Sequence, residues 1–268
     1  MGGVRPRDRW AVLAGLGGVA AGAWIYLVFV ARPMSTGMTR AGMTDPSMGH
    51  AMQSAMQMRT WSATESGLML SMWAVMMVAM MLPTAVPMTL VYAAVARKAE
   101  RDGHPIAPTS VFVAGYLVVW ALFSVAAAAG QRGLDQLALL SPAMASASPV
   151  LGSALLIAAG VYELTPMKHA CLAQCRAPAH FIATHWRPGS TGAFRMGLGL
   201  GTYCLGCCWV LMGLLFLGGV MNLLWIAAIA VFILLEKTMP FGQNGGRVVG
   251  IAMVFVGLLG LTGMIGLG

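Results

Sequence analysis

The chain has 268 residues, of which 59% are hydrophobic and only 9% are charged. This composition excludes an ordinary soluble domain, a disordered chain and a small disulfide-rich secreted protein, and it predicts a membrane protein with several spans. The formal net charge of +8 is explained by topology, because short inside loops collect Lys and Arg. No basic run is interleaved with aromatic residues, so we expect no nucleic-acid partner.

A span of a lipid bilayer needs about 20 mainly apolar residues, and seven segments are interpreted as spans on this basis. In chain order they are Trp10–Ala31, Gly67–Ala96, Pro108–Gly130, Pro149–Thr165, Met196–Gly218, Met221–Leu235 and Val248–Leu267. The fourth is short, so the expected fold is an all-α polytopic transmembrane helix bundle with six or seven spans. Only residues 218–222 separate the fifth and sixth segments, which predicts a tight turn between two helices.

The distribution of Lys and Arg predicts a cytoplasmic N-terminus, because this orientation places most basic residues in inside segments. We expect residues 1–31 to form a basic segment and a retained first span, because its apolar run is longer than that of a signal peptide. Residues 32–66 are expected to form a Met-rich extracytoplasmic loop. Residues 67–268 are expected to form the helix bundle, with a cytoplasmic Cys/His segment at 167–195.

The expected outer loop is rich in methionine. Residues 34–58 contain seven of them, which are Met34, Met38, Met43, Met48, Met52, Met56 and Met58. Thioethers are soft ligands that select Cu(I) and need no deprotonation, so Met48, Met52 and the nearby His50 are candidate ligands for copper capture. The alternative is an amphipathic segment that lies on the bilayer with its methionines toward lipid.

A methionine stripe runs along the second expected span. At 100° per residue, four methionines gather on one helix face and three more on a second face. The first group is Met69, Met72, Met76 and Met80, and the second is Met77, Met81 and Met88. The first face would pass Cu(I) between sulfurs, with Met72, Met76 and Met80 as candidate ligands. The alternative is that methionine fills irregular gaps in helix packing.

Two helix starts carry capping signals. Ser62 and Glu65 form an S-x-x-E capping box directly before the second span. Glu65 is therefore expected to cap the helix rather than to bind metal. Asn222 is expected to cap the sixth span in a similar way.

All cysteines of the chain fall close together in the sequence. They are Cys171, Cys175, Cys204, Cys207 and Cys208. The first two are four residues apart and would share a helix face, and His169 precedes them closely. The other three lie within about 100° of one another on the fifth span. We expect this cluster to hold Cu(I) rather than zinc, because its spacing is not that of a zinc finger. The alternative is that these cysteines are small apolar core residues. Gly197 and Gly201 lie on nearly the same face and would let another helix approach closely.

Glu163 is the ionisable residue most clearly inside a span. A charge there costs at least about 2.5–3.5 kcal/mol, so such a group usually faces a partner or a pathway. It is expected to be a metal ligand, a proton acceptor or a neutral carboxylic acid that is hydrogen-bonded in the bundle. Glu236 and Lys237 are adjacent at a span end, which predicts an interfacial ion pair or snorkelling side chains.

Three sequence blocks are distinctive. They are Met72–Pro83 with Pro87–Met88 after it, Tyr162–Lys168 leading to Cys171 and Cys175, and Tyr203–Trp209. Together they resemble a bacterial family of predicted metal-binding integral membrane proteins whose function is unassigned. The resemblance covers about residues 61–268 and implies a multi-pass protein of the bacterial inner membrane with a metal site. It implies neither a substrate nor a reaction.

The leading hypothesis is non-catalytic Cu(I) handling, as transport or as delivery to a membrane or periplasmic metalloprotein. The alternative is a membrane thiol-disulfide oxidoreductase that uses Cys204 and Cys207, although the sequence places no cation beside them. A third hypothesis is an accessory subunit of a membrane complex without chemistry of its own. The chain has no G-x-x-x-x-G-K-[ST] motif, so we do not expect a primary pump.

Overall fold

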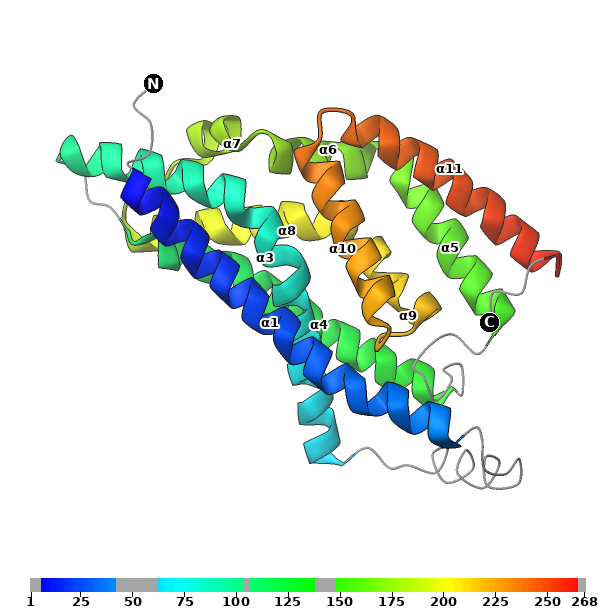
Figure 1. The fold of residues 1–268 in the computed structure, drawn as a ribbon. Helices are drawn as coiled ribbons and strands as arrows, with labels where there is room; N and C mark the ends of the chain where they lie inside the picture. The colour runs from blue at the N-terminus through cyan, green and yellow to red at the C-terminus, as the bar shows by residue number, and fades with distance from the viewer. Residues whose placement is uncertain (1–5, 42–61, 104–106, 138–147, 265–268) are drawn as a thin grey trace.

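The computed structural model describes residues 6–41, 62–103, 107–137 and 148–264, and every secondary-structure element in these ranges is a helix (Figure 1). A helix corresponds to each of the seven expected segments. These are α1 (Pro6–Ala41), α3 (Ala63–Arg101), α4 (Thr109–Gln136), α5 (Pro149–Glu163), α8 (Gly189–Gly213), α10 (Leu223–Thr238) and α11 (Gly242–Leu261). The short helices are α6 (Pro166–Arg176), α7 (Pro178–His185) and α9 (Leu215–Gly218). The expected all-α bundle is confirmed.

Five of the described helical segments are long and apolar enough to cross a membrane. A sixth crossing results if α5 and α6, which meet at a bend of 64°, are counted as one broken span. Helix α10, with 16 residues, is shorter than the about 20 residues that a span needs. By length and composition the described residues therefore give five spans, or six with the broken one, against the six or seven expected.

The first helix is longer than its apolar part. Its apolar stretch ends at Phe29, close to the expected end at Ala31, but the helical backbone continues to Ala41. The first residues of the expected outer loop therefore belong to α1. Met48, His50 and Met52 lie outside the described residues, so their role as ligands stays a prediction.

The helices pack in pairs that bury small residues. Helix α5 lies along α11, α4 along α8, and α1 along α3, while α6 and α7 lie across the end of the bundle at which α1 begins (Figure 1). A Cβ added at Gly201 would lie 2.8 Å from Cγ2 of Val119 on α4, and one added at Gly197 would meet the carbonyl oxygen of Phe112. The expected close approach of a helix at Gly197 and Gly201 is confirmed, and it positions α8 in the centre of the fold.

Both expected caps are present. The Ser62 side chain accepts a hydrogen bond of 3.2 Å from the backbone N–H of Glu65, and the Glu65 carboxylate accepts one of 3.1 Å from the backbone N–H of Ser62. Asn222 accepts a hydrogen bond of 3.2 Å from the backbone N–H of Trp225 at the start of α10. Gly219 supplies the φ of +90° that the turn between α9 and α10 requires.

The methionine stripe of α3 is buried. Met72, Met76 and Met80 are 6%, 0% and 1% exposed, and Met77, Met81 and Met88 are buried as well. They form part of one continuous hydrophobic core with residues of α4, α8 and α10. This burial is what gap-filling methionines require. Transfer of Cu(I) along the stripe stays a prediction.

Candidate functional site

A helix break at Thr165 and Pro166 sets the geometry of the site. The Thr165 hydroxyl donates a hydrogen bond of 2.7 Å to the carbonyl of Tyr162 and accepts one of 3.3 Å from the backbone N–H of Lys168. Pro166 occupies the first turn of α6, where its missing N–H costs nothing. The chain therefore ends α5, bends by 64° and starts α6, which lies against α8.

This bend brings the cysteines of α6 to those of α8. The sulfur of Cys171 lies over Gly206, because a Cβ added at Gly206 would be 2.9 Å from it. One turn further along α6, Cys175 lines the same small cavity as Cys204 of α8. All five cysteines are free thiols, and the three on α8 are buried. Cysteines of two helices thus approach one another, and their role as a joint copper site stays a prediction.

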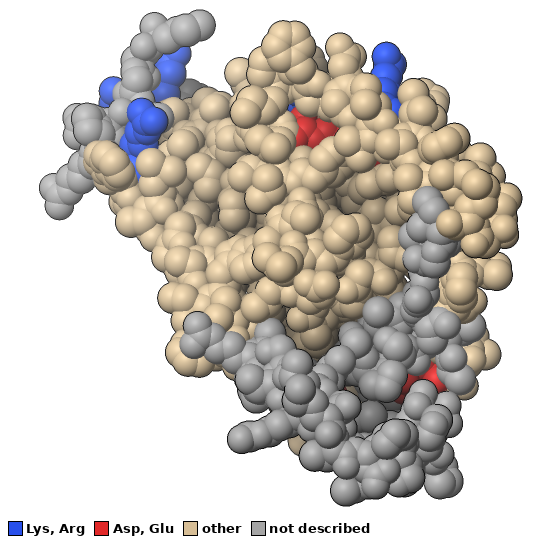
Figure 2. Space-filling view, turned by 45° about the vertical axis from the view of Figure 1, so that its right-hand side comes forward, with Lys and Arg blue, Asp and Glu red and all other residues tan. Residues whose placement is uncertain are grey.

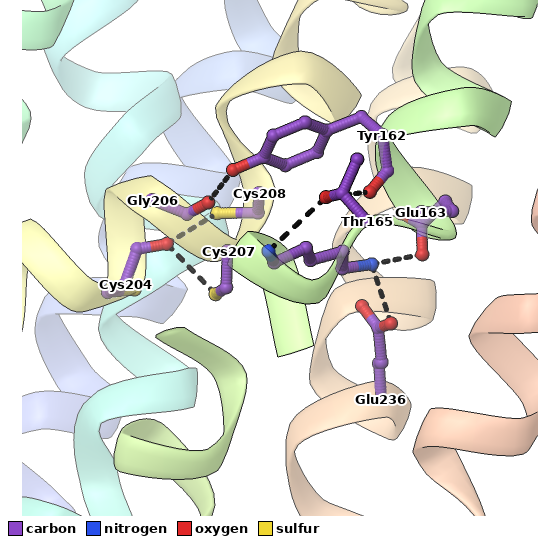
Figure 3. Close-up of polar contacts among 9 residues, drawn as sticks. Tyr162, Glu163, Thr165, Cys204, Gly206, Cys207, Cys208 and Glu236 are labelled. Atoms are coloured by element: carbon purple, nitrogen blue, oxygen red, sulfur yellow. Dashed lines mark hydrogen bonds and ion pairs between the residues drawn. The ribbon is translucent and has the colours of Figure 1, made fainter. Parts of the chain in front are cut away.

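The three cysteines of α8 have different surroundings. The thiols of Cys207 and Cys208 each donate a hydrogen bond of 3.0 Å to the backbone carbonyl of Cys204, as Figure 3 shows. The sulfur of Cys204 instead lies 2.8 Å from the ammonium of Lys237 and 3.2 Å from the hydroxyl of Tyr116. That hydroxyl is also 3.0 Å from the carbonyl oxygen of Met81. Cys204 is therefore the thiol that receives polar contacts from neighbouring helices.

The position of Lys237 differs from two expectations from the sequence. Its side chain neither snorkels nor pairs with Glu236, because it is 8% exposed and its ammonium donates to Cys204 and, at 3.5 Å, to the hydroxyl of Thr84. No carboxylate in the described part of the chain forms an ion pair with it. The expectation that no cation lies near the C-x-x-C thiols was also wrong, because α10 brings one from a distant position in the sequence. A lysine at the end of an apolar run was the signal that could have identified it.

A small cavity opens beside Cys204. Its volume of about 10 Å³ is close to the minimum that one water molecule needs. Its lining combines two thiols and a thioether with polar groups and comprises Thr84, Ala85, Met88, Tyr116, Cys175, Leu200, Cys204 and Lys237. Thiolates and thioethers are the donors that select Cu(I) over hard cations. The space therefore offers a soft donor set at the contact between α3, α6 and α8.

A second polar cluster lies at the α5–α6 break. The ammonium of Lys168 pairs with the Glu163 carboxylate and lies 2.6 Å from Oε1 of Glu236 (Figure 3). Lys168 and Glu163 are fully buried and Glu236 is 4% exposed. The hydroxyl of Tyr162 donates to the carbonyl of Gly206, which ties this cluster to the cysteine helix. Glu163 is thus hydrogen-bonded within the bundle, as one of the expectations stated, but its partner is a lysine.

The remaining predicted ligands are not gathered into one coordination sphere. Neither ring nitrogen of His169 has a hydrogen-bond partner within the described ranges. The stripe methionines Met72, Met76 and Met80 lie on α3, in the hydrophobic core of the bundle. No three His, Cys, Asp or Glu side chains of the described residues are arranged to hold one metal ion together. Any ion at the cavity would therefore take fewer of these ligands, or would take Met88 as well.

Comparison with known families identifies the chain. No curated protein and no solved structure matches it. The sequence model of one family, PpoB2, which is described as a copper chaperone, matches residues 70–260. This range includes α4 to α10, most of α3 and α11, and all five cysteines. Because the match extends over more than half of the sequence, the chain belongs to the PpoB2 copper chaperone family.

Proposed function

We propose that the chain is a membrane-embedded copper chaperone that binds Cu(I) between thiols of α6 and α8 and delivers it to a metalloprotein partner. The single observation that carries this proposal is the cavity that Cys175 of α6 and Cys204 of α8 line together with Met88. Cu(I) is stable with two soft ligands, so a pair of these thiolates is sufficient to hold it. The bound ion is the cargo of the protein rather than a resident cofactor.

The surface supports a position in the membrane. Within the described ranges, five helical segments are long and apolar enough to cross a bilayer. On the face shown in Figure 2, charged side chains lie near the two ends of the molecule, and the broad middle is uncharged. Charged groups are costly in hydrocarbon and tolerated at the interfaces, so this distribution suits an integral membrane protein. We place the chain in the inner membrane of a bacterium with its N-terminus in the cytoplasm.

The Met-rich segment around Met48, His50 and Met52 is proposed to gather Cu(I) before it reaches the cysteines. Its thioethers would bind copper weakly and exchange it readily, whereas thiolates bind more tightly. An increase in affinity from thioether to thiolate would favour movement toward the cysteines. The same soft donors would also accept Ag(I).

The test is Cu(I) binding by protein that is purified in detergent under reducing conditions. We expect the wild type to bind about one Cu(I) per chain in competition with a chromogenic chelator, because the cavity accommodates a single small ion. Cys204→Ala should abolish this binding. Thr202→Ala is a matched control, because Thr202 is an exposed residue of the same helix and its hydroxyl only bonds the carbonyl of Leu198. Copper-free wild-type protein, or full binding by Cys204→Ala, would refute the proposal.

The contact between Lys237 and Cys204 also favours a second candidate, a thiol-disulfide oxidoreductase. An ammonium next to a cysteine promotes its thiolate form, which is the nucleophile in disulfide exchange. In that reaction Cys204 and Cys207 would become a disulfide, and their two electrons and two protons would reduce a disulfide of a partner protein. Trapping cellular protein with an alkylating reagent distinguishes the two candidates: a Cys204–Cys207 disulfide favours the oxidoreductase, and two free thiols favour the chaperone.

A further inference from the structure

The ammonium of Lys237 lies against a thiol. It is 2.8 Å from the sulfur of Cys204, and Cys175 lines the same cavity. The other polar contact is the hydroxyl of Thr84 at 3.5 Å. The buried Lys168, in contrast, is held by two carboxylates. The two buried lysines therefore differ in what balances their charge.

A buried ammonium without a counter-charge is costly, because an isolated ion loses its hydration when it leaves water. The groups beside Lys237 in this cavity that are able to carry a negative charge are the thiols of Cys175 and Cys204 and the phenol of Tyr116. The position of Lys237 thus fits a site that holds copper through thiolates, because a coordinated thiolate would supply the counter-charge.

The charges at the site balance when copper is bound. Cu(I) held by two thiolates carries a single negative charge in total, and one neighbouring ammonium makes the whole site neutral. Binding would form two Cu–S bonds and send the thiol protons to solvent, with no change in oxidation state. The copper-loaded site then carries no net charge, which avoids the penalty for an uncompensated buried ion.

We propose that Lys237 is the fixed counter-charge of the copper site and sets it to two thiolate ligands. This inference depends on the proposed function, because it concerns the same thiols. Lys237 touches no copper in this arrangement and acts through Cys204, so it is a positioning residue. Its hydrogen bond to the sulfur also fixes the direction in which Cys204 presents its remaining lone pairs.

The test compares two substitutions that separate charge from hydrogen bonding. Lys237→Gln removes the charge but keeps an N–H donor, and Lys237→Arg keeps both. We expect Lys237→Gln to weaken Cu(I) binding at least about tenfold, and Lys237→Arg to stay within about threefold of the wild type, because only the former leaves a buried negative charge unbalanced. Lys98→Gln is the matched control, because Lys98 lies in α3 at a groove toward α7, away from the thiols.

A second measurement needs no variant. X-ray absorption of copper-loaded wild-type protein should show two sulfur ligands at thiolate distance, and three would overturn the inference. Equal or tighter Cu(I) binding by Lys237→Gln would overturn it as well, because a lysine that merely competes with copper would give that sign. If the wild type binds copper, Cys204→Ala does not and Lys237→Gln binds normally, then this inference fails while the proposed function stands. A wild type without copper defeats both.

Discussion

The ammonium of Lys168 on α6 lies 2.6 Å from the carboxylate oxygen of Glu236 on α10 and also pairs with Glu163 at the end of α5. One side chain thus joins three helices next to the cysteine cluster. Both contacts are buried, so solvent does not weaken them. The bent junction of α5 and α6 is held in place by this charge cluster as well as by Thr165 and Pro166.

We predict that Lys168→Met lowers the free energy of unfolding by about 3–5 kcal/mol, because it leaves two carboxylates close together without a cation. Thermal or denaturant unfolding in detergent measures the change. Lys98→Met, which removes a lysine from the end of α3, should have little effect. The double variant with Glu236→Gln should recover part of the loss, because it removes one of the unpaired charges. A loss below about 1 kcal/mol for the single variant would show that the cluster does not stabilise the fold.

Gly197 provides a prediction about the contact of α8 with α4. A Cβ at this position would meet the carbonyl oxygen of Phe112, so Gly197→Ala must move one helix away from the other. We expect a destabilisation of about 1–3 kcal/mol, which is typical of overpacking. Gly213→Ala is the control on the same helix, because its Cβ would have nothing within 4 Å. The control should be neutral or should gain up to about 1 kcal/mol from helix propensity. Similar unfolding temperatures for the two variants would contradict the prediction.

Substitutions in the buried methionine stripe of α3 distinguish a packing role from the passage of Cu(I) along it. Substitution of Met72, Met76 and Met80 by Leu keeps the side-chain volume, so we expect each change to cost less than about 1.5 kcal/mol. If these residues only fill the hydrophobic core, Cu(I) affinity and the rate of copper loading should both match the wild type. Stopped-flow loading with a Cu(I)-chelator complex measures this rate. A markedly slower rate at unchanged affinity would instead support passage of copper along the stripe.

The capping box predicts a local effect at the start of α3. Ser62→Ala removes the acceptor of the Glu65 N–H, which should cost about 1 kcal/mol. Hydrogen exchange should rise at the first-turn amides of α3 and remain unchanged at its centre. Ser71→Ala is the comparison, because its hydroxyl bonds only the carbonyl of Leu68 within the same helix. Unaltered exchange at Glu65 would contradict the role of the cap.

Local signals in the sequence predicted the helices well. The apolar runs located the long helices, and the short-range patterns at Ser62 and Asn222 placed two caps correctly, because each depends on residues within one helical turn. The close contact at Gly197 also followed from the helix period. The length of α1 was harder to predict, because backbone hydrogen bonding continues after the apolar stretch ends.

The candidate site was predicted in part. The number and spacing of the cysteines indicated that α6 and α8 approach one another, and Cys171 lies over Gly206 accordingly. The contacts of Lys237 and Tyr116 with Cys204 did not, because they arise where α10 and α4 meet α8 and span long distances in sequence. For the same reason Glu236 was assigned to its neighbour Lys237 rather than to Lys168. Partners of buried charges are chosen by tertiary packing, which a single sequence does not encode locally.

The cysteine cluster has a consequence for the order in which the protein matures. Its thiols come from α6 and α8, and α7 separates these helices in the chain. During synthesis the first pair leaves the ribosome well before the second, so a nascent chain that ends after α7 carries only half of the donor set. Under the proposed function, selective copper capture would therefore await insertion of α8 and its docking against α6. A truncated product would retain apolar helices and yet lack half of the proposed donor set.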